Sequence, residues 1–118
     1  MYGLPSDPAI DVLKGQSLIQ VCFGENDLFL NFSRNVSFEV FSSIGLGVDP
    51  GAISRSTDFL EVSQELLRLL SVLVSDVSWA NDGTISITFE TGYVVELYDD
   101  SEQFESYTIK RPGGVVVV

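Results

Sequence analysis

The residues FSRNVSFEVF at positions 32–41 are matched 57 positions later by FETGYVVELY at positions 89–98. Apolar or aromatic residues coincide at five of the aligned positions, and Glu39 coincides with Glu96. Asn35 aligns with Gly92, and both residue types tolerate a left-handed backbone at a tight turn. The two stretches therefore predict the same hairpin in each half of the chain.

The repeat extends upstream of both stretches. Leu28 and Leu30 align with Ile85 and Ile87 at the same offset, and Val21 and Phe23 align with Val77 and Trp79 after a one-residue adjustment. Apolar residues alternate with polar ones in each segment, which is typical of half-buried antiparallel strands. We predict two three-stranded meanders, at about 17–41 and 74–98, related by a pseudo-twofold axis.

The segment between the meanders predicts one helix, over about 58–73. Apolar residues recur there at spacings of three and four, as on a helix that faces a core. Asp58 is the expected N-cap, with Glu61 completing a capping-box pattern. The glycine- and serine-rich residues 42–57 are expected to form a flexible connector. The apolar stripe consists of Phe59, Val62, Leu66, Leu69 and Leu73.

The C-terminal residues predict a β-hairpin. Residues 107–109 form a short strand, Pro112 and two glycines turn the chain, and four valines follow at 115–118. These valines need a strand partner, because an exposed all-valine edge would aggregate. The predicted fold class is α+β, with one helix packed on the sheet. The meanders could share one sheet or close towards a barrel, and the pattern does not decide between them.

The length and composition indicate a single folded domain over residues 1–118. The chain is 45% hydrophobic, which argues against disorder despite a net charge of −11. Cys22 is the only cysteine and cannot form an internal disulfide. We find neither an apolar run of membrane-spanning length nor the pattern of a signal peptide, and we therefore expect a cytoplasmic protein.

The charge is strongly one-sided. The chain contains seventeen acidic residues, six basic residues and no histidine. Eight of the acids lie between Arg68 and Lys110, where no basic residue occurs. Such a surface repels nucleic acid and anionic membranes and attracts a basic protein.

Three features with catalytic or cofactor-binding potential are better explained as structural. Cys22 lacks a base or a positive environment to activate its thiol. The glycines of residues 45–51 do not have the spacing of a dinucleotide-binding loop. Nothing in the sequence brings Glu39 and Glu96 together as a catalytic carboxylate pair. We therefore predict no catalytic, cofactor-binding or metal-binding residue.

The acidic loop after position 98 is the predicted partner-binding surface. Its carboxylates would steer a basic partner, and aromatic residues beside them would anchor it. Calcium also prefers clustered carboxylates, but the spacing and glycine of an EF-hand are missing, so we favour a protein contact. The predicted contact residues are Tyr98, Asp99, Asp100, Glu102, Phe104 and Glu105.

These motifs resemble a family of small bacterial proteins known only as a domain of unknown function. The likeness covers roughly residues 13–118, with a strand, Phe-x-x-Gly, strand unit in each half and an aromatic-Glu-Ser-aromatic-x-Ile element at 104–109. Asn35 departs from it by replacing a glycine. The resemblance implies no catalytic residue. More loosely, a small, acidic α+β protein is similar in composition to the immunity proteins of polymorphic toxin systems, which bind and block a toxin.

We therefore expect a non-enzymatic, acidic binding protein, most concretely an immunity-type inhibitor that occludes a basic toxin domain. The second hypothesis is a structural or assembly module that forms a homodimer or pairs through strand edges. The third is an enzyme or small-molecule binder that uses carboxylates alone, for which the sequence offers the least support.

Overall fold

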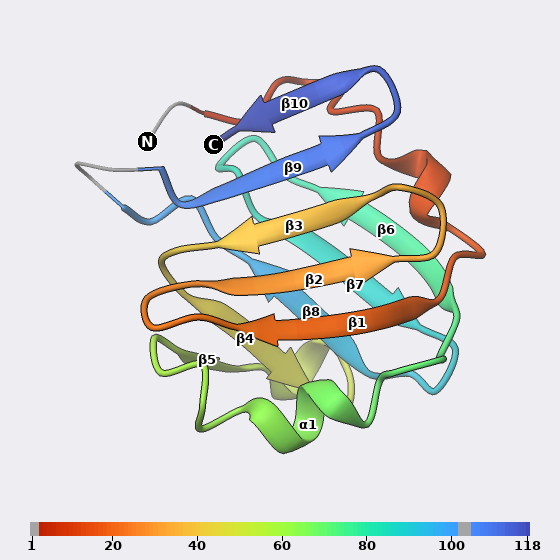
Figure 1. Ribbon diagram of the computed structural model, residues 1–118, viewed down its shortest axis with the longest axis vertical. Coiled ribbons are helices and arrows are strands. Elements are labelled where there is room, and N and C mark those ends of the chain that lie inside the picture. Colours follow the sequence, from red (N-terminus) through yellow and green to blue (C-terminus); the bar gives the residue numbers. More distant parts are fainter. Residues whose placement is uncertain (1–2, 102–104) are drawn as a thin grey trace.

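The part of the chain that the structure describes forms two five-stranded antiparallel sheets and one short α-helix (Figure 1). The computed structural model describes residues 3–101 and 105–118. The first sheet has the order β1 (Leu18–Phe23), β2 (Leu28–Phe32), β3 (Ser37–Val40), β9 (Tyr107–Arg111), β10 (Gly114–Val117). The second has the order β5 (Ser54–Ser56), β4 (Ile44–Gly47), β8 (Val94–Leu97), β7 (Ile85–Phe89), β6 (Val74–Trp79).

Each predicted meander is present, but the strand that follows it crosses to the other sheet. β4 follows the first meander and pairs with β8, and β9 follows the second meander and pairs with β3. The two sheets therefore have matching strand orders. The strands β1, β2, β3, β9 and β10 of the first sheet correspond, in that order, to β6, β7, β8, β4 and β5 of the second. The described part of the chain therefore forms neither the single sheet nor the closing barrel that the sequence left open, because the crossing strands complete two separate sheets.

The predicted left-handed turns are confirmed. Asn35 has φ of 63° and Gly92 has φ of 91°. Backbone hydrogen bonds close the two turns in the same way, from Phe32 N at 2.8 Å and from Phe89 N at 2.9 Å, each to the oxygen four residues on. The predicted C-terminal hairpin is also confirmed, since β9 and β10 pair in a regular register.

The two halves contact each other through matched hydrogen bonds. Gly15 N donates to Val74 O at 2.9 Å, and at the corresponding positions Ser71 N donates to Leu18 O at 2.7 Å. Gly15 and Ser71 both have positive φ, 81° and 69° respectively. The backbone thus takes the same unusual conformation at the entrance to both meanders.

The core lies between the sheets and is filled by the inward residues of both meanders. Phe32 makes an edge-on contact with Phe38, with ring centroids 6.0 Å apart, and stacks on Phe89 at 6.5 Å. Tyr107 is fully buried, and its hydroxyl donates a hydrogen bond to Gly83 O at 2.6 Å. This buried polar group is therefore satisfied within the core.

The prediction of a helix over 58–73 is wrong in length. The only α-helix of the described residues, α1, covers Ser63–Leu67. The helix ends at Leu67, and the chain does not resume it because Leu70 and Leu73 form isolated bridges with the residues that begin the first meander and Ser71 between them takes a positive φ. Leu66 and Leu69 are buried as predicted, and Phe59 and Val62 pack in part against the core, whereas Leu73 is 39% exposed.

The predicted capping box is also wrong. Asp58 does not precede the helix; its side chain accepts a hydrogen bond from Leu60 N at 3.1 Å in a turn that comes before it. The helix begins after Val62, which makes no side-chain cap. A short polar side chain favours a turn as readily as a helix start, and here the turn prevails.

Residues 42–57 are not the flexible connector that their composition suggested. They contain β4, the 3₁₀ helix η2 (Pro50–Ala52) and β5. A further 3₁₀ helix, η1 (Asp11–Leu13), precedes the first meander. At Gly47 a side chain would meet the carbonyl carbon of Ala52 at 2.8 Å, so glycine allows the chain to fold back over β4. None of the helices in the described ranges is long and apolar enough to cross a bilayer.

Candidate functional site

Asp100, a predicted contact residue, is bound within the chain. Its carboxylate forms an ion pair with Arg55 of β5, Nη2 to Oδ2 at 2.5 Å, and accepts a hydrogen bond from Ser43 Oγ at 2.5 Å. Partial burial raises the pKa of Asp100, but hydrogen bonds from Ser42, Ser43 and Arg55, together with the charge of Arg55, leave that pKa below its usual value. Asp100 therefore helps to hold the second sheet together.

Tyr98 is held by the same arginine. The Arg55 guanidinium lies 3.7 Å from the centre of the Tyr98 ring, and the Tyr98 hydroxyl donates to Glu96 at 3.0 Å. Burial and the bond to Glu96 raise the pKa of Tyr98 to about 12, so the phenol stays protonated at neutral pH. Glu96 also accepts a hydrogen bond from Ser86 at 2.7 Å.

The remaining predicted contact residues fall into two groups. Asp99 is half-buried and accepts a hydrogen bond from Ser106 Oγ at 3.1 Å, and Glu105 is half-buried beside Phe41. Glu102 and Phe104 lie outside the described residues. The partner-binding role of this loop stays a prediction, but the structure shows that Asp99 and Asp100 already have partners in the chain.

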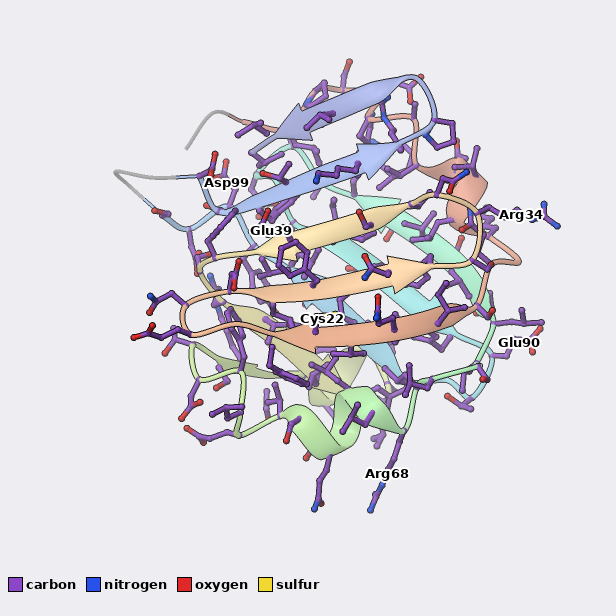
Figure 2. The ribbon with its side chains drawn as sticks, in the orientation of Figure 1. Cys22, Arg34, Glu39, Arg68, Glu90 and Asp99 are labelled. Atoms are coloured by element: carbon purple, nitrogen blue, oxygen red, sulfur yellow. The ribbon has the colours of Figure 1, made fainter. Side chains whose placement is uncertain are left out.

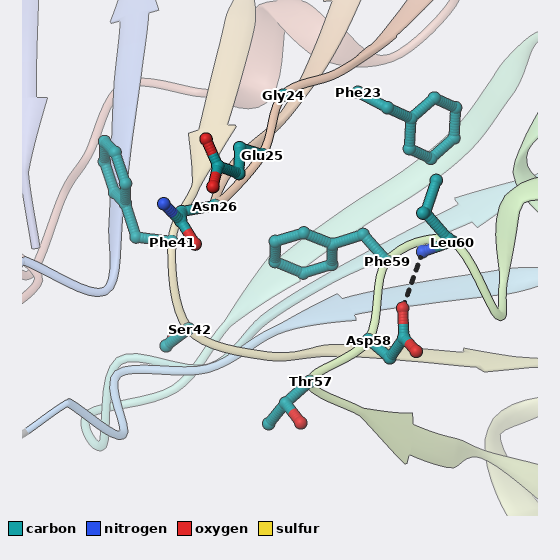
Figure 3. Close-up of a pocket in the computed structure, with 10 residues that line it drawn as sticks. All are labelled: Phe23, Gly24, Glu25, Asn26, Phe41, Ser42, Thr57, Asp58, Phe59 and Leu60. Atoms are coloured by element: carbon teal, nitrogen blue, oxygen red, sulfur yellow. Dashed lines mark hydrogen bonds between the residues drawn. The ribbon is translucent and has the colours of Figure 1, made fainter.

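A groove lies beside this loop, at the end of β1, and has a volume of about 580 Å³ (Figure 3). Phe23, Phe41, Phe59 and Leu60 supply apolar surface, and none of the lining residues is basic. Leu60 is 69% exposed. The complete lining consists of Phe23, Gly24, Glu25, Asn26, Phe41, Ser42, Thr57, Asp58, Phe59 and Leu60. We call this the acid-rimmed groove.

Short turns place the walls of the acid-rimmed groove. Gly24 N donates to Asp27 O at 2.9 Å, which closes the β1–β2 turn and directs Glu25 and Asn26 to one side. The hydrogen bond from Leu60 N to Asp58, drawn in Figure 3, fixes the opposite wall. A second hollow shares Asn26 and Phe41 and leads on to Ser101 and Glu105. The groove therefore reaches the predicted acidic loop.

Further carboxylates lie near the groove on the outer face of the first sheet. Burial, a hydrogen bond with Asp27 and the negative charges of Asp27 and Glu105 raise the pKa of Glu39, although Lys110 opposes the shift. Carboxylates that crowd one another in this way favour the approach of a positive charge. The surface next to the groove is therefore suited to a lysine or arginine side chain.

The corresponding aromatic residues of the second half have partners in the chain. Trp79 aligns with Phe23, and its indole nitrogen donates to Ser6 O at 3.0 Å. Tyr98 aligns with Phe41 and is covered by Arg55. The phenylalanines have no polar atom to satisfy, and they line an open hollow instead. Phe23 also packs in part against the core, as the alternating pattern of its strand predicts. The phenylalanines at positions matched by tryptophan and tyrosine were the signal that could have indicated the groove.

Two other sequence candidates, Cys22 and the pair Glu39 and Glu96, do not line the groove. Cys22 is half-buried on β1 opposite Phe29. Glu39 and Glu96 lie on strands of different sheets, β3 and β8, so the structure does not bring them together as a catalytic pair. Figure 2 shows Cys22 and Glu39 on the face of the first sheet.

Comparison with known proteins places the chain in one family. A family model described as a family of unknown function (DUF6188) matches residues 9–118, which is nearly the whole chain and includes both meanders. No curated protein and no solved structure matches the chain. The family description names no activity, and it agrees with the likeness seen in the repeated hairpin and the C-terminal element. The chain belongs to this family of unknown function, DUF6188.

Proposed function

We propose that this chain is a non-enzymatic binding protein that holds a basic protein in the acid-rimmed groove. Its most concrete form is an immunity-type inhibitor that occludes a basic toxin domain in the cytoplasm. The observation that carries the proposal is the groove itself, where the half-buried Phe23, Phe41 and Phe59 and the exposed Leu60 are bordered by Glu25 and Asp58, and no lining residue is basic.

The mechanism divides between charge and apolar contact. A net charge of −11 accelerates the approach of a basic domain, and carboxylates near the groove orient it. An apolar side chain of the partner then enters between Phe41 and Phe59, where removal of water gives most of the affinity. Occlusion requires no chemistry from this chain, because covering a positively charged active site is sufficient.

The proposal includes a pseudo-twofold relation between the halves. The matched hydrogen bonds of Gly15 and Ser71 support it, as does the interchangeable strand order of the two sheets. Under this relation the groove is the place where duplicated elements have diverged. An open hollow at Phe23 and a partnered Trp79 at the matching position suggest that one end of the molecule became the binding end.

The proposal is tested with the protein encoded immediately upstream of this chain, produced alone and together with it. We expect that protein to be basic and toxic, and growth to be restored by the wild-type chain. Glu25→Lys reverses a charge at the groove, whereas Glu90→Lys makes the same change at the opposite end of the strands (Figure 2). Rescue should be lost with the first variant and kept with the second.

A second pair of variants tests the apolar contact. Leu60 and Val48 are 69% and 67% exposed, but only Leu60 lines the groove. Leu60→Ser should weaken binding to the purified upstream protein by about tenfold or more, and Val48→Ser should not. If the wild-type chain neither binds that protein nor restores growth, the proposed function is wrong.

A further inference from the structure

β10 forms the outer edge of the first sheet and leaves backbone groups without a strand partner. Val118 N donates to Tyr107 O at 2.9 Å and Tyr107 N donates to Val118 O at 3.3 Å, so these residues form a hydrogen-bonded pair. Hydrogen-bonded and non-hydrogen-bonded residue pairs alternate along antiparallel strands, so Val116 is also hydrogen-bonded to β9. The backbone N–H and C=O groups of Val115 and Val117 point instead to the open side of β10, away from β9.

This four-residue edge lacks the side chains and the bulge that often prevent strand pairing. No backbone hydrogen bond joins Val115 or Val117 to another segment within residues 3–101 and 105–118, and their side chains are 59% and 37% exposed. Edge strands usually carry a lysine, a proline or a bulge that prevents pairing. β10 has the sequence GVVV and a register without irregularity. The edge is therefore competent to accept another strand.

The local charge identifies the strand that fits. Residues 106–118 contain no acidic residue and include Lys110 and Arg111, two of the six basic residues of the chain. A second copy presents the same uncharged strand, GVVV, so the two edges match each other about Val116. Two copies of the chain, each with a charge of −11, repel each other least where acids are absent. The occupant best matched to this edge is thus a second copy.

We propose that the chain self-associates by antiparallel pairing of β10 with β10 of a second copy, centred on Val116. In this register Val115 of each copy faces Val117 of the other, and their outward groups form four reciprocal hydrogen bonds. The two first sheets become one continuous sheet. The groove lies at the end of β1, the opposite edge of the same sheet, so it stays open in the dimer.

The contact is small, and its affinity should be correspondingly low. Only a few valines and one strand edge are covered in each copy, well below the area of a permanent interface. Sedimentation velocity of the wild-type chain should therefore show a monomer at low micromolar concentration and a growing dimer fraction towards millimolar concentration. A monomer across this whole range would overturn the proposal.

Val117→Pro tests the edge selectively. Proline removes an outward N–H from each copy, while the ladder to β9 does not use that group, so the fold should remain. We expect the dimer dissociation constant to rise by about tenfold or more. Val117→Thr keeps the N–H and should associate like the wild type. A dimer unaffected by Val117→Pro would place the interface elsewhere and overturn the proposal.

A crosslink gives a readout that does not depend on the proline variant. In the proposed register Val116 faces Val116 of the second copy as a non-hydrogen-bonded pair, with Cα atoms about 4.5 Å apart. That separation suits a disulfide. Val116→Cys in a Cys22→Ser background should form a covalent dimer on oxidation, and failure to form it would count against the register. These tests need no basic partner, so they are independent of the proposed function.

Discussion

Replacement of Asp100 by asparagine separates a structural role from a partner-binding one. Asn has nearly the same shape but no charge, so Asp100→Asn weakens the ion pair with Arg55 and the hydrogen bond from Ser43. A hydrogen bond to a charged group contributes about 1.5–3 kcal/mol, whereas an exposed ion pair contributes about 0.2–1 kcal/mol. The side chains of Arg55 and Asp100 are 49% and 29% exposed, so we expect the contribution of this pair to stability to lie between these two ranges.

We expect Asp100→Asn to lower the free energy of unfolding by about 1–2 kcal/mol at pH 7 and the melting temperature by roughly 4–10 °C. The assay is urea unfolding followed by circular dichroism. Glu25→Gln is the matched control, because Glu25 is exposed and should leave the free energy of unfolding unchanged.

The pH dependence provides a sharper criterion. The pKa of Asp100 is lowered in the folded chain, so its contribution is complete above the unfolded pKa of about 3.9 and is lost as pH falls through the folded pKa. The difference between wild type and Asp100→Asn should thus be constant from pH 7 to pH 5. It should shrink below about pH 4. Equal stability at pH 7, or a difference that grows in acid, would refute the assignment of Asp100 to the fold.

Three further variants test the core, a turn and the carboxylate surface. Tyr107→Phe removes the donor to Gly83 O and should lower the free energy of unfolding by about 1–3 kcal/mol in urea titrations. Gly92→Ala places a side chain on a backbone with φ of 91° and should cost about 1 kcal/mol or more by the same assay; an unchanged midpoint would contradict the turn conformation. Glu39→Gln should stabilise the chain at pH 7, because burial, the hydrogen bond with Asp27 and like charges raise the pKa of Glu39 in the folded state. Because folding raises the pKa of this carboxyl group, its ionisation destabilises the folded chain as pH rises above the unfolded pKa. The stabilising effect of glutamine should therefore vanish below about pH 4, and a series of melting curves at different pH values checks this.

The meanders could be predicted because one residue pattern determines them. Alternating apolar residues define the strands, and Asn35 and Gly92 set the turns with the backbone conformation that such residues favour. The destination of β4 and β9 could not be predicted in this way. Residues 44–47 alternate glycine with aliphatic residues, and all four are buried, so no polar face indicates which sheet they join.

The predicted helix was too long because a stripe of leucines does not indicate the residue at which a helix ends. Leu66 and Leu69 fit both a helix face and a compact turn, and the bridges made by Leu70 and Leu73 depend on the first meander being next to them. Long-range contacts of this kind override local propensity. The sequence contains no glycine at position 71 that would have signalled the change.

The groove was not predicted from the sequence, and the predicted contact loop lies beside it. Of that loop, Glu102 and Phe104 lie outside the described residues, and Asp100 is paired with Arg55, 45 residues away in the sequence, because β4 lies between β5 and β8 and pairs with both. The groove depends on Phe23, Phe41 and Phe59, which come from three separate segments. These three side chains meet at one groove because the chain crosses between the sheets, and no local pattern encodes that meeting.

The association rate of the chain with the basic protein encoded upstream tests the central claim most directly. Stopped-flow fluorescence across a range of salt concentrations should show a rate that falls steeply as salt increases, because dissolved ions screen the attraction that orients the two proteins. The slope should be smaller for Glu25→Lys than for the wild type or Glu90→Lys. A rate that is independent of salt, or an identical slope for all three proteins, would contradict an acidic groove that captures a basic partner.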